Sequence, residues 1–378
     1  MAEVPNAEEP RAESSLHPPA AAQQADQSQN PAAEDDATET GHVVGDDEDE
    51  NHVAGLEIDT SSDSGFGDDE AGSETSSLAS SLLRGHIENG RKYSTLRDDY
   101  WGPSDDQQFE TMDAGHFVYL LMESGRDNPL FRSPLRFPRN VLDIGTGTGT
   151  WAIDVADKFP DVNVHGVDLY PPPNSWVPPN CFLEVQDVLQ EWTWNYQFDL
   201  VHMRLLLGAF TDAEWDQVYR TVYENLKPGG WIEQVELDVR VMSDDESLPK
   251  DSLLAGWGQN FLGCSERSGR PLSTQTTMAG RITAAGFTNL QDDLFKCPLG
   301  SWPKDKRLKE AGRVNLHHWS SGLDGWAMWL LTKHGAPTPW SADVVRVYVA
   351  KVRQELKQKG LHIYHFTRRV WAQKPYDA

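Results

Sequence analysis

The sequence is short of the residue types that mark secreted, disulfide-stabilised or membrane-spanning proteins. It has three cysteines in 378 residues, Cys181, Cys264 and Cys297, which are odd in number and lack the spacing of a zinc site. It also has no Asn-x-Ser/Thr acceptor for N-linked glycans. No stretch approaches the ~18 apolar residues that a bilayer-spanning helix needs. We therefore expect reduced thiols, no structural metal and no association with a membrane.

The first residues, MAEVPNAEEPRAES, also lack features of an export signal. They have neither the basic start nor the apolar run of a secretory signal peptide. A strong basic import cluster is absent as well. Together these observations predict an intracellular protein, located in the cytoplasm or the nucleus.

Positive charge is almost missing from the first 80 residues, where 21 acidic residues accompany a single basic one, Arg11. This segment therefore carries most of the net charge of −26, and it contains few large apolar residues. It cannot bury enough apolar surface to offset the entropy of ordering, so we predict a disordered acidic tail over 1–80. The remainder, 81–378, is expected to form one domain that is not basic enough to bind nucleic acid directly.

From residue 140 onward, strand-like and helix-like segments alternate. This alternation, with nearly continuous apolar strands, predicts a Rossmann-like, doubly wound α/β sheet of seven strands that carries helical insertions. The expected strands cover 140–144, 162–167, 181–186, 198–203, 231–238, 286–295 and 361–367. The expected helices cover 107–124, 149–158, 212–226, 250–267, 274–285, 304–333 and 341–358. The Lys-Pro-Gly-Gly sequence at 227–230 is expected to end a helix and form the turn before the fifth strand.

Three glycines alternate with threonines where the first strand should turn into its helix. A nucleotide phosphate, a different adenosine ligand and a plain tight turn could each explain them. The dinucleotide pattern G-x-G-x-x-G/A fails at its last position, which is Thr150. The pattern G-x-G-x-G with an acid two residues ahead is complete in Asp143, Gly145, Gly147 and Gly149. Asp143 could contact a ligand or only brace the loop.

Two more acids follow at the ends of the next strands. Asp168, followed by Leu169, ends the second strand, where a carboxylate can accept hydrogen bonds from both hydroxyls of a ribose. Asp187 and Val188 end the third strand, where they could meet the edge and face of an adenine. Together with the glycine loop, these positions predict a site for a ligand that contains adenosine.

His202 and Arg204 lie at the end of the fourth strand. Both could face a second substrate there, with His202 as a proton acceptor and Arg204 as a binding residue. Packing in the core and a surface ion pair are the plainer interpretations.

These motifs resemble the class I S-adenosylmethionine-dependent methyltransferases and, more narrowly, the fungal LaeA-type group. The narrower resemblance rests on SLLRGHIENGRKY, VLDIGTGTGTWAIDVADKFP, NSWVPPN, WPKDKRLKEAGR and IYHFTRRVWAQKP, and it covers residues 81–375. The family's usual Gly-Arg-Lys-Pro ending is Ala-Gln-Lys-Pro here, at 372–375.

The resemblance implies that the cofactor is S-adenosyl-L-methionine and that its amino-acid part lies along the glycine loop. Arg91 could then reach the cofactor carboxylate, and Tyr93 could reach its sulfonium. The expected activity is methyl transfer to a small metabolite or a protein, in or controlling secondary metabolism. A regulatory subunit that acts through velvet-type partners with little catalysis is the alternative.

The sequence also contains 14 tryptophans. Trp302, Trp319, Trp326 and Trp329, in the predicted carboxyl-terminal helices, could surround a flat apolar substrate. Ordinary helix packing is the simpler explanation for most of them.

Overall fold

The computed structural model describes residues 85–377 apart from residue 175. The predicted disordered tail, 1–80, lies outside the described residues. Within the described part, none of the helices combines the length and apolarity that a bilayer crossing requires.

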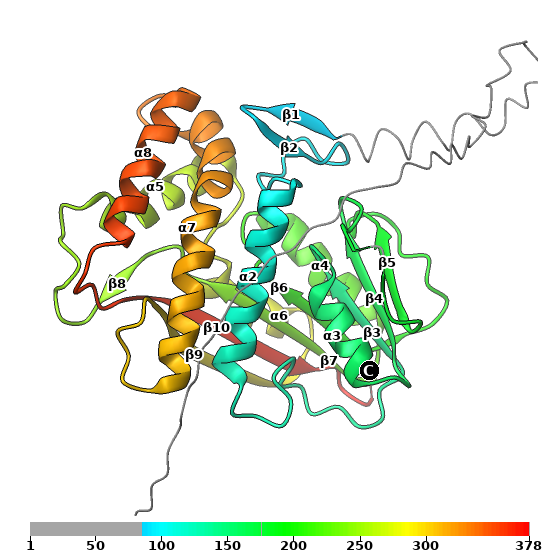
Figure 1. The fold of residues 1–378 in the computed structure, drawn as a ribbon. Helices are drawn as coiled ribbons and strands as arrows, with labels where there is room; N and C mark the ends of the chain where they lie inside the picture. The colour runs from blue at the N-terminus through cyan, green and yellow to red at the C-terminus, as the bar shows by residue number, and fades with distance from the viewer. Residues whose placement is uncertain (1–84, 175, 378) are drawn as a thin grey trace, which may run out of the picture. The chain divides into compact units, whose positions relative to one another are not determined.

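Five parallel strands form the centre of one sheet (Figure 1), as the sequence predicted. They are β3 (Asn140–Ile144), β4 (Asn163–Asp168), β5 (Cys181–Val185), β6 (Phe198–Arg204) and β7 (Leu226–Leu237). Their order across the sheet is β5-β4-β3-β6-β7, so the chain starts in the middle and winds outward to both sides. In such a sheet ligands bind outside the carboxyl ends of the central strands.

The far edge of the sheet is antiparallel. Strand β10 (Ile363–Gln373) lies beside β7 and runs against it, and β9 (Thr288–Leu299) pairs with β10 on the other side. These two strands complete the seven that were predicted. The sequence analysis missed an eighth, the two-residue β8 (Met242–Ser243), which also pairs with β10.

All seven predicted helices are present, with ends that differ by a few residues. They are α2 (Asp106–Glu123), α3 (Thr150–Lys158), α4 (Asp212–Asn225), α5 (Leu253–Ser268), α6 (Thr274–Ala284), α7 (Lys306–His334) and α8 (Ala342–Leu356). Helices α4 and α6 pack on one face of the sheet, and α3 packs on the other. Helices α5, α7 and α8 share a separate apolar cluster and form the predicted helical insertions.

The alternation of side chains along β3 decides which residues face the site. Val141 packs with α3, whereas Leu142 and Ile144 pack with α4 and α6 on the opposite face. Asp143 therefore points to the α3 face. His202 lies directly beside it, because these two residues are paired across β3 and β6.

The Lys-Pro-Gly-Gly sequence was predicted to be a turn, and this was wrong. Helix α4 ends at Asn225, but residues 227–230 already belong to β7. The register against β6 shifts here, so that Phe198 pairs with Leu226 and Leu200 pairs with Trp231. The extra residues of β7 form a bulge, which Gly229 permits with its φ of 81°.

A short hairpin precedes α2. Strands β1 (His86–Glu88) and β2 (Arg91–Tyr93) pair antiparallel. Asn89 and Gly90 join them with positive φ angles of 53° and 85°, as a tight two-residue turn of this type requires.

Candidate functional site

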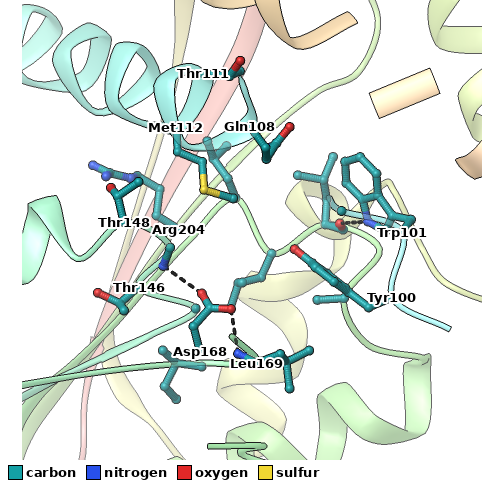
Figure 2. A pocket seen from close by; sticks show the side chains of 18 of the residues that line it. Tyr100, Trp101, Gln108, Thr111, Met112, Thr146, Thr148, Asp168, Leu169 and Arg204 are labelled. Carbon is teal, nitrogen blue, oxygen red and sulfur yellow. Dashed lines mark hydrogen bonds between the residues drawn. The ribbon is translucent and has the colours of Figure 1, made fainter. Parts of the chain in front are cut away.

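A cleft lies at the carboxyl ends of β3, β4, β5 and β6 and continues beneath α2 and α7. Of the predicted site residues, those that line it are Asp143, Gly145, Gly147, Asp168, Leu169, Asp187, Val188, His202 and Arg204. The structure therefore brings together residues that the sequence spreads over 60 positions. Figure 2 shows part of this cleft, with Asp168 and Leu169 below Met112 of α2.

The glycine loop owes its shape to backbone angles that other residues rarely adopt. The φ angles of Gly145, Gly147 and Gly149 are 68°, 61° and 82°. At Gly147 a Cβ atom would lie 3.0 Å from the sulfur of Met112, in the space between the loop and α2. This glycine allows a ligand to approach the main chain closely.

Gly149 packs against the sheet. It does not line the cleft, and a Cβ atom there would lie 2.5 Å from Cδ1 of Leu183 in β5. The residue starts α3 and lets the helix pack closely on the sheet. Cofactor contact at Gly149 thus finds no support in the geometry.

The threonines of the loop fix it on two sides. Thr146 donates a hydrogen bond of 2.8 Å to Asp143, on the strand that leads into the loop. Thr148 and Thr150 each donate one of 2.7 Å to the same oxygen of Asp113, on α2. The position that breaks the dinucleotide pattern, Thr150, thus helps to hold α2 over the site.

Asp168 joins the end of β4 to the glycine loop. Its two oxygens accept hydrogen bonds of 2.7 Å from the amides of Gly147 and Leu169 (Figure 2). Burial raises the pKa of Asp168 to about 6, while these amide bonds act in the opposite direction. Each oxygen keeps a lone pair that a ligand hydroxyl can use.

The end of β5 contributes a polar edge and an apolar surface. Asp187 and Val188 lie where the sequence placed them, and the neighbouring Gln186 also lines the cleft. Asp187 accepts a hydrogen bond of 3.1 Å from the amide of Leu189, so part of its role is to fix its own turn. Val188 is buried and offers an apolar contact.

His202 and Asp143 form a buried pair that faces the cleft. Nδ1 of His202 lies 2.7 Å from Oδ1 of Asp143, and the imidazole stacks on Trp151 with 3.8 Å between ring centroids. Because a carboxylate only accepts hydrogen bonds, Nδ1 carries the proton and Nε2 keeps a lone pair. Burial lowers the pKa of His202, so the ring is neutral at pH 7 and can accept a proton.

Arg204 is a cation without a carboxylate partner within 4 Å among the described residues. It donates a hydrogen bond of 3.0 Å to Nδ1 of His116, whose Nε2 lies 2.8 Å from Asp154. Its guanidinium also lies 5.2 Å from the ring centroid of Tyr119. The plainer interpretation of Arg204, a surface ion pair, is therefore wrong.

Arg91 and Tyr93 do not line the cleft. Arg91 is buried in an ion pair with Asp105, at 2.7 Å, and also lies 3.3 Å from Asp324. Tyr93 packs in an apolar cluster with only 2% of its surface exposed. The geometry does not support the predicted cofactor contacts of these two residues, because the hairpin fixes them outside the cleft.

The segment that follows the hairpin lines the cleft instead. Tyr100 and Trp101 both face it, and the indole of Trp101 donates a hydrogen bond of 3.1 Å to the carbonyl of Leu207 (Figure 2). Sequence reasoning missed these residues, since an isolated Tyr-Trp pair has no motif. The only available signal was its aromatic character just ahead of a capped helix.

Glu236 is a third functional residue that could not be predicted from a motif. This fully buried carboxylate accepts hydrogen bonds of 3.1 Å from the amides of Leu206 and Leu207. It thereby fixes the cleft-lining loop after β6, in which Leu205 has an unusual φ of 59°. Burial raises the pKa of Glu236 to about 7.

This arrangement suits a ligand that combines adenosine with a charged chain. Carboxylates lie at the ends of β3, β4 and β5, the glycine main chain is bonded to Asp168, and the neutral His202 and cationic Arg204 lie on β6. The site can bind hydroxyls, pair with an anion and accept a proton.

Comparisons with known proteins point to one kind of chemistry. A family model described as a methyltransferase domain matches residues 116–292. Methyltransferase pytC of Aspergillus terreus is 36% identical over 310 residues, which cover 80% of this chain and 92% of that protein. Secondary metabolism regulator LAE1 of Cochliobolus heterostrophus is 33% identical over 287 residues, which cover 74% of this chain and 92% of that protein.

Solved structures give a more distant similarity. Phosphoethanolamine N-methyltransferase 2 of Haemonchus contortus, in complex with S-adenosyl-L-methionine, is 17% identical with a TM-score of 0.41. The match covers 72% of this chain and 59% of that chain.

The raised pKa of Glu236 gives a testable pH dependence. The pKa of Glu236 is about 7 in the folded protein and 4.5 in the unfolded chain, so binding of its proton stabilises the fold. This stabilisation is complete below pH 4.5 and is lost as the pH rises through about 7. Between pH 5 and pH 8, urea unfolding should show the wild type losing about 2 kcal/mol more than Glu236→Gln, which has no proton to release. Equal pH dependences of the two proteins would contradict this role.

Proposed function

Because the chain belongs to the LaeA-type, S-adenosyl-L-methionine-dependent methyltransferases, we propose that its cleft holds this cofactor beside a methyl acceptor. The protein is a methyltransferase linked to fungal secondary metabolism, and its cofactor is S-adenosyl-L-methionine. The observation that carries the assignment of the site is the bond between Asp168 and Gly147, which joins a ribose-binding carboxylate to the glycine loop.

We assign the parts of the cofactor to residues by their chemistry. Asp168 is the acceptor for the ribose hydroxyls, and Leu169 lies beside it. The main chain at Gly145 and Gly147 lies along the methionine part. Asp187 and Val188 offer a polar and an apolar contact to the adenine.

Arg204 is better suited to the cofactor than to the acceptor, to which the sequence analysis assigned it. Arg204 contacts His116, whose other ring nitrogen lies 2.8 Å from Asp154 of α3, the helix that follows the glycine loop. Figure 2 draws Arg204 on the opposite side of the view from Trp101. An unpaired guanidinium at this end can pair with the carboxylate of the methionine part.

The bound cofactor supplies a methyl group that its sulfonium has already activated. The residues of the chain then have to orient the acceptor and, where the acceptor is a hydroxyl, remove its proton. The pair of His202 and Asp143 can do this, because Asp143 holds the imidazole with Nε2 free of the proton.

Partner recognition is a second candidate function. Several relatives are named as regulators of secondary metabolism, which supports a cofactor-binding subunit that acts through velvet-type proteins. We place either function inside the cell, in the cytoplasm or nucleus, since all three cysteines are free and buried. Measurable methyl transfer by the isolated chain favours the enzyme over the regulatory subunit.

Cofactor affinity tests the role of Asp168. Asp168→Ala should lose ~1.5–3 kcal/mol of binding energy, a roughly ten- to hundredfold weaker affinity, because charge-assisted bonds to buried hydroxyls are lost. Calorimetric titration with S-adenosyl-L-methionine measures this loss. The exposed Asp157, on the outer side of α3, provides the matched control Asp157→Ala, which should bind like the wild type. An unchanged affinity of Asp168→Ala would remove this residue from the site.

The proton-accepting role of His202 requires a variant that preserves its bond to Asp143. His202→Asn keeps a donor near the position of Nδ1 and removes the basic Nε2. Transfer of labelled methyl groups from S-adenosyl-L-methionine to acceptors in a cell extract should slow about 10²–10⁴-fold if the acceptor is a hydroxyl. The affinity of the variant for the cofactor should stay within about threefold of the wild type. A wild-type rate of transfer in this variant would exclude His202 as the base.

A further inference from the structure

The far end of the cleft is aromatic and has a different character from the glycine-loop end. It is lined by Trp101, Leu207, Val239, Trp257, Phe261, Leu272, Trp319 and Trp326. These residues come from the segment before α2, from the loops after β6, β7 and α5, and from the helices α5 and α7. None of them belongs to the parts of the cleft assigned above to the cofactor.

The rings in this region are packed tightly and held in place. Trp257 and Phe261 lie one turn apart on α5 and stack with 4.3 Å between ring centroids. Trp319 and Trp326, two turns apart on α7, meet edge to face at 5.6 Å. Trp257 and Trp319 are each 1% exposed, so the aromatic walls lie deep in the protein.

The carboxylates that line the cleft all lie at one of its two ends. Of the described residues that line it, the carboxylates are Asp143, Asp168 and Asp187, all at the ends of β3, β4 and β5. The aromatic end has no lining carboxylate among these residues. Its titratable group is His318, whose Nδ1 lies 2.8 Å from the carbonyl oxygen of Thr111 and whose pKa burial lowers to about 4. Arg97, the lining arginine ahead of Trp101, is paired with Glu214 at 2.8 Å. The described residues therefore leave no unpaired charge at this end at neutral pH.

We infer that the aromatic end binds the methyl acceptor and that this acceptor is a flat, apolar small molecule without positive charge. Deep aromatic walls favour stacking with a planar ring system. A lysine or arginine side chain of a protein would enter without a carboxylate to pair with, although ring faces attract cations weakly. This inference rests on the proposed function, since it identifies the second substrate of the same site.

Polar groups at the mouth of this region fit an acceptor that carries a hydroxyl or carbonyl group. Tyr100, between the two ends, has a hydroxyl without a hydrogen-bond partner among the described residues, and burial raises its pKa above the usual value, so the hydroxyl keeps its proton. Gln108 and Thr111 of α2 also line the cleft. These neutral groups can orient a hydroxyl or carbonyl group without selecting for charge.

Binding of a simple probe tests the inference independently of turnover. The probe is 2-naphthol, a flat apolar molecule with one hydroxyl, titrated calorimetrically into the protein saturated with S-adenosyl-L-homocysteine. We expect it to bind, and Trp326→Ala to weaken its affinity about tenfold through loss of a stacking wall. Trp326→Phe, which keeps an aromatic ring, should recover most of the affinity.

The control is Trp302→Ala, because Trp302 does not line the cleft and is 37% exposed. It should bind 2-naphthol like the wild type, and a thermal unfolding curve of each variant establishes that it is folded. A lysine-rich peptide, titrated in the same way, should not compete with 2-naphthol.

Three results would overturn the inference. The first is that 2-naphthol does not bind to the protein saturated with S-adenosyl-L-homocysteine. The second is that the wild type and folded Trp326→Ala bind 2-naphthol with equal affinity, and the third is that the lysine-rich peptide displaces 2-naphthol. Titration with S-adenosyl-L-homocysteine alone separates this failure from failure of the proposed function. If that ligand binds and 2-naphthol does not, the acceptor class is wrong and the cofactor assignment remains.

Discussion

The bond between the carboxylate of Asp168 and the amide of Gly147 is the interaction on which the site depends. It ties the end of β4 to the loop that follows β3, so two neighbouring strands present one edge to a ligand. The loop is fixed further by Thr146, bound to Asp143, and by Thr148, bound to α2. A rigid loop matters because a preorganised main chain loses little entropy when a ligand binds.

Beneath α2, the protein keeps ionisable groups that are costly to bury, and each one serves the cleft. Asp143 orients His202, His116 contacts the guanidinium of Arg204, and Glu236 holds the loop after β6. Buried charges destabilise a fold unless partners compensate them. Function is the best explanation for these groups around the cleft, since apolar residues would pack there at lower cost.

The sequence was most informative where function depends on local chain geometry. The strands, the helices and the acids at strand ends follow from periodicity and turn chemistry, so Asp143, Asp168 and Asp187 could be predicted. The packing of Gly149 could not be predicted, because its neighbour, Leu183, comes from a strand more than 30 residues away. Tyr100 and Glu236 carry no motif. Only tertiary packing brings Tyr100 to the cleft and Glu236 to the amides of the loop after β6. The same holds for the aromatic end, which is built from α5, α7, the segment before α2 and the loops after β6, β7 and α5.

A crystal structure of the protein grown with S-adenosyl-L-homocysteine tests the central claim most directly. The account predicts both ribose hydroxyls within about 2.5–3.0 Å of the Asp168 carboxylate. The homocysteine chain should run along the main chain at Gly147, with the adenine beside Val188. A ligand bound outside this cleft, or inside it with the sugar away from Asp168, would contradict the account.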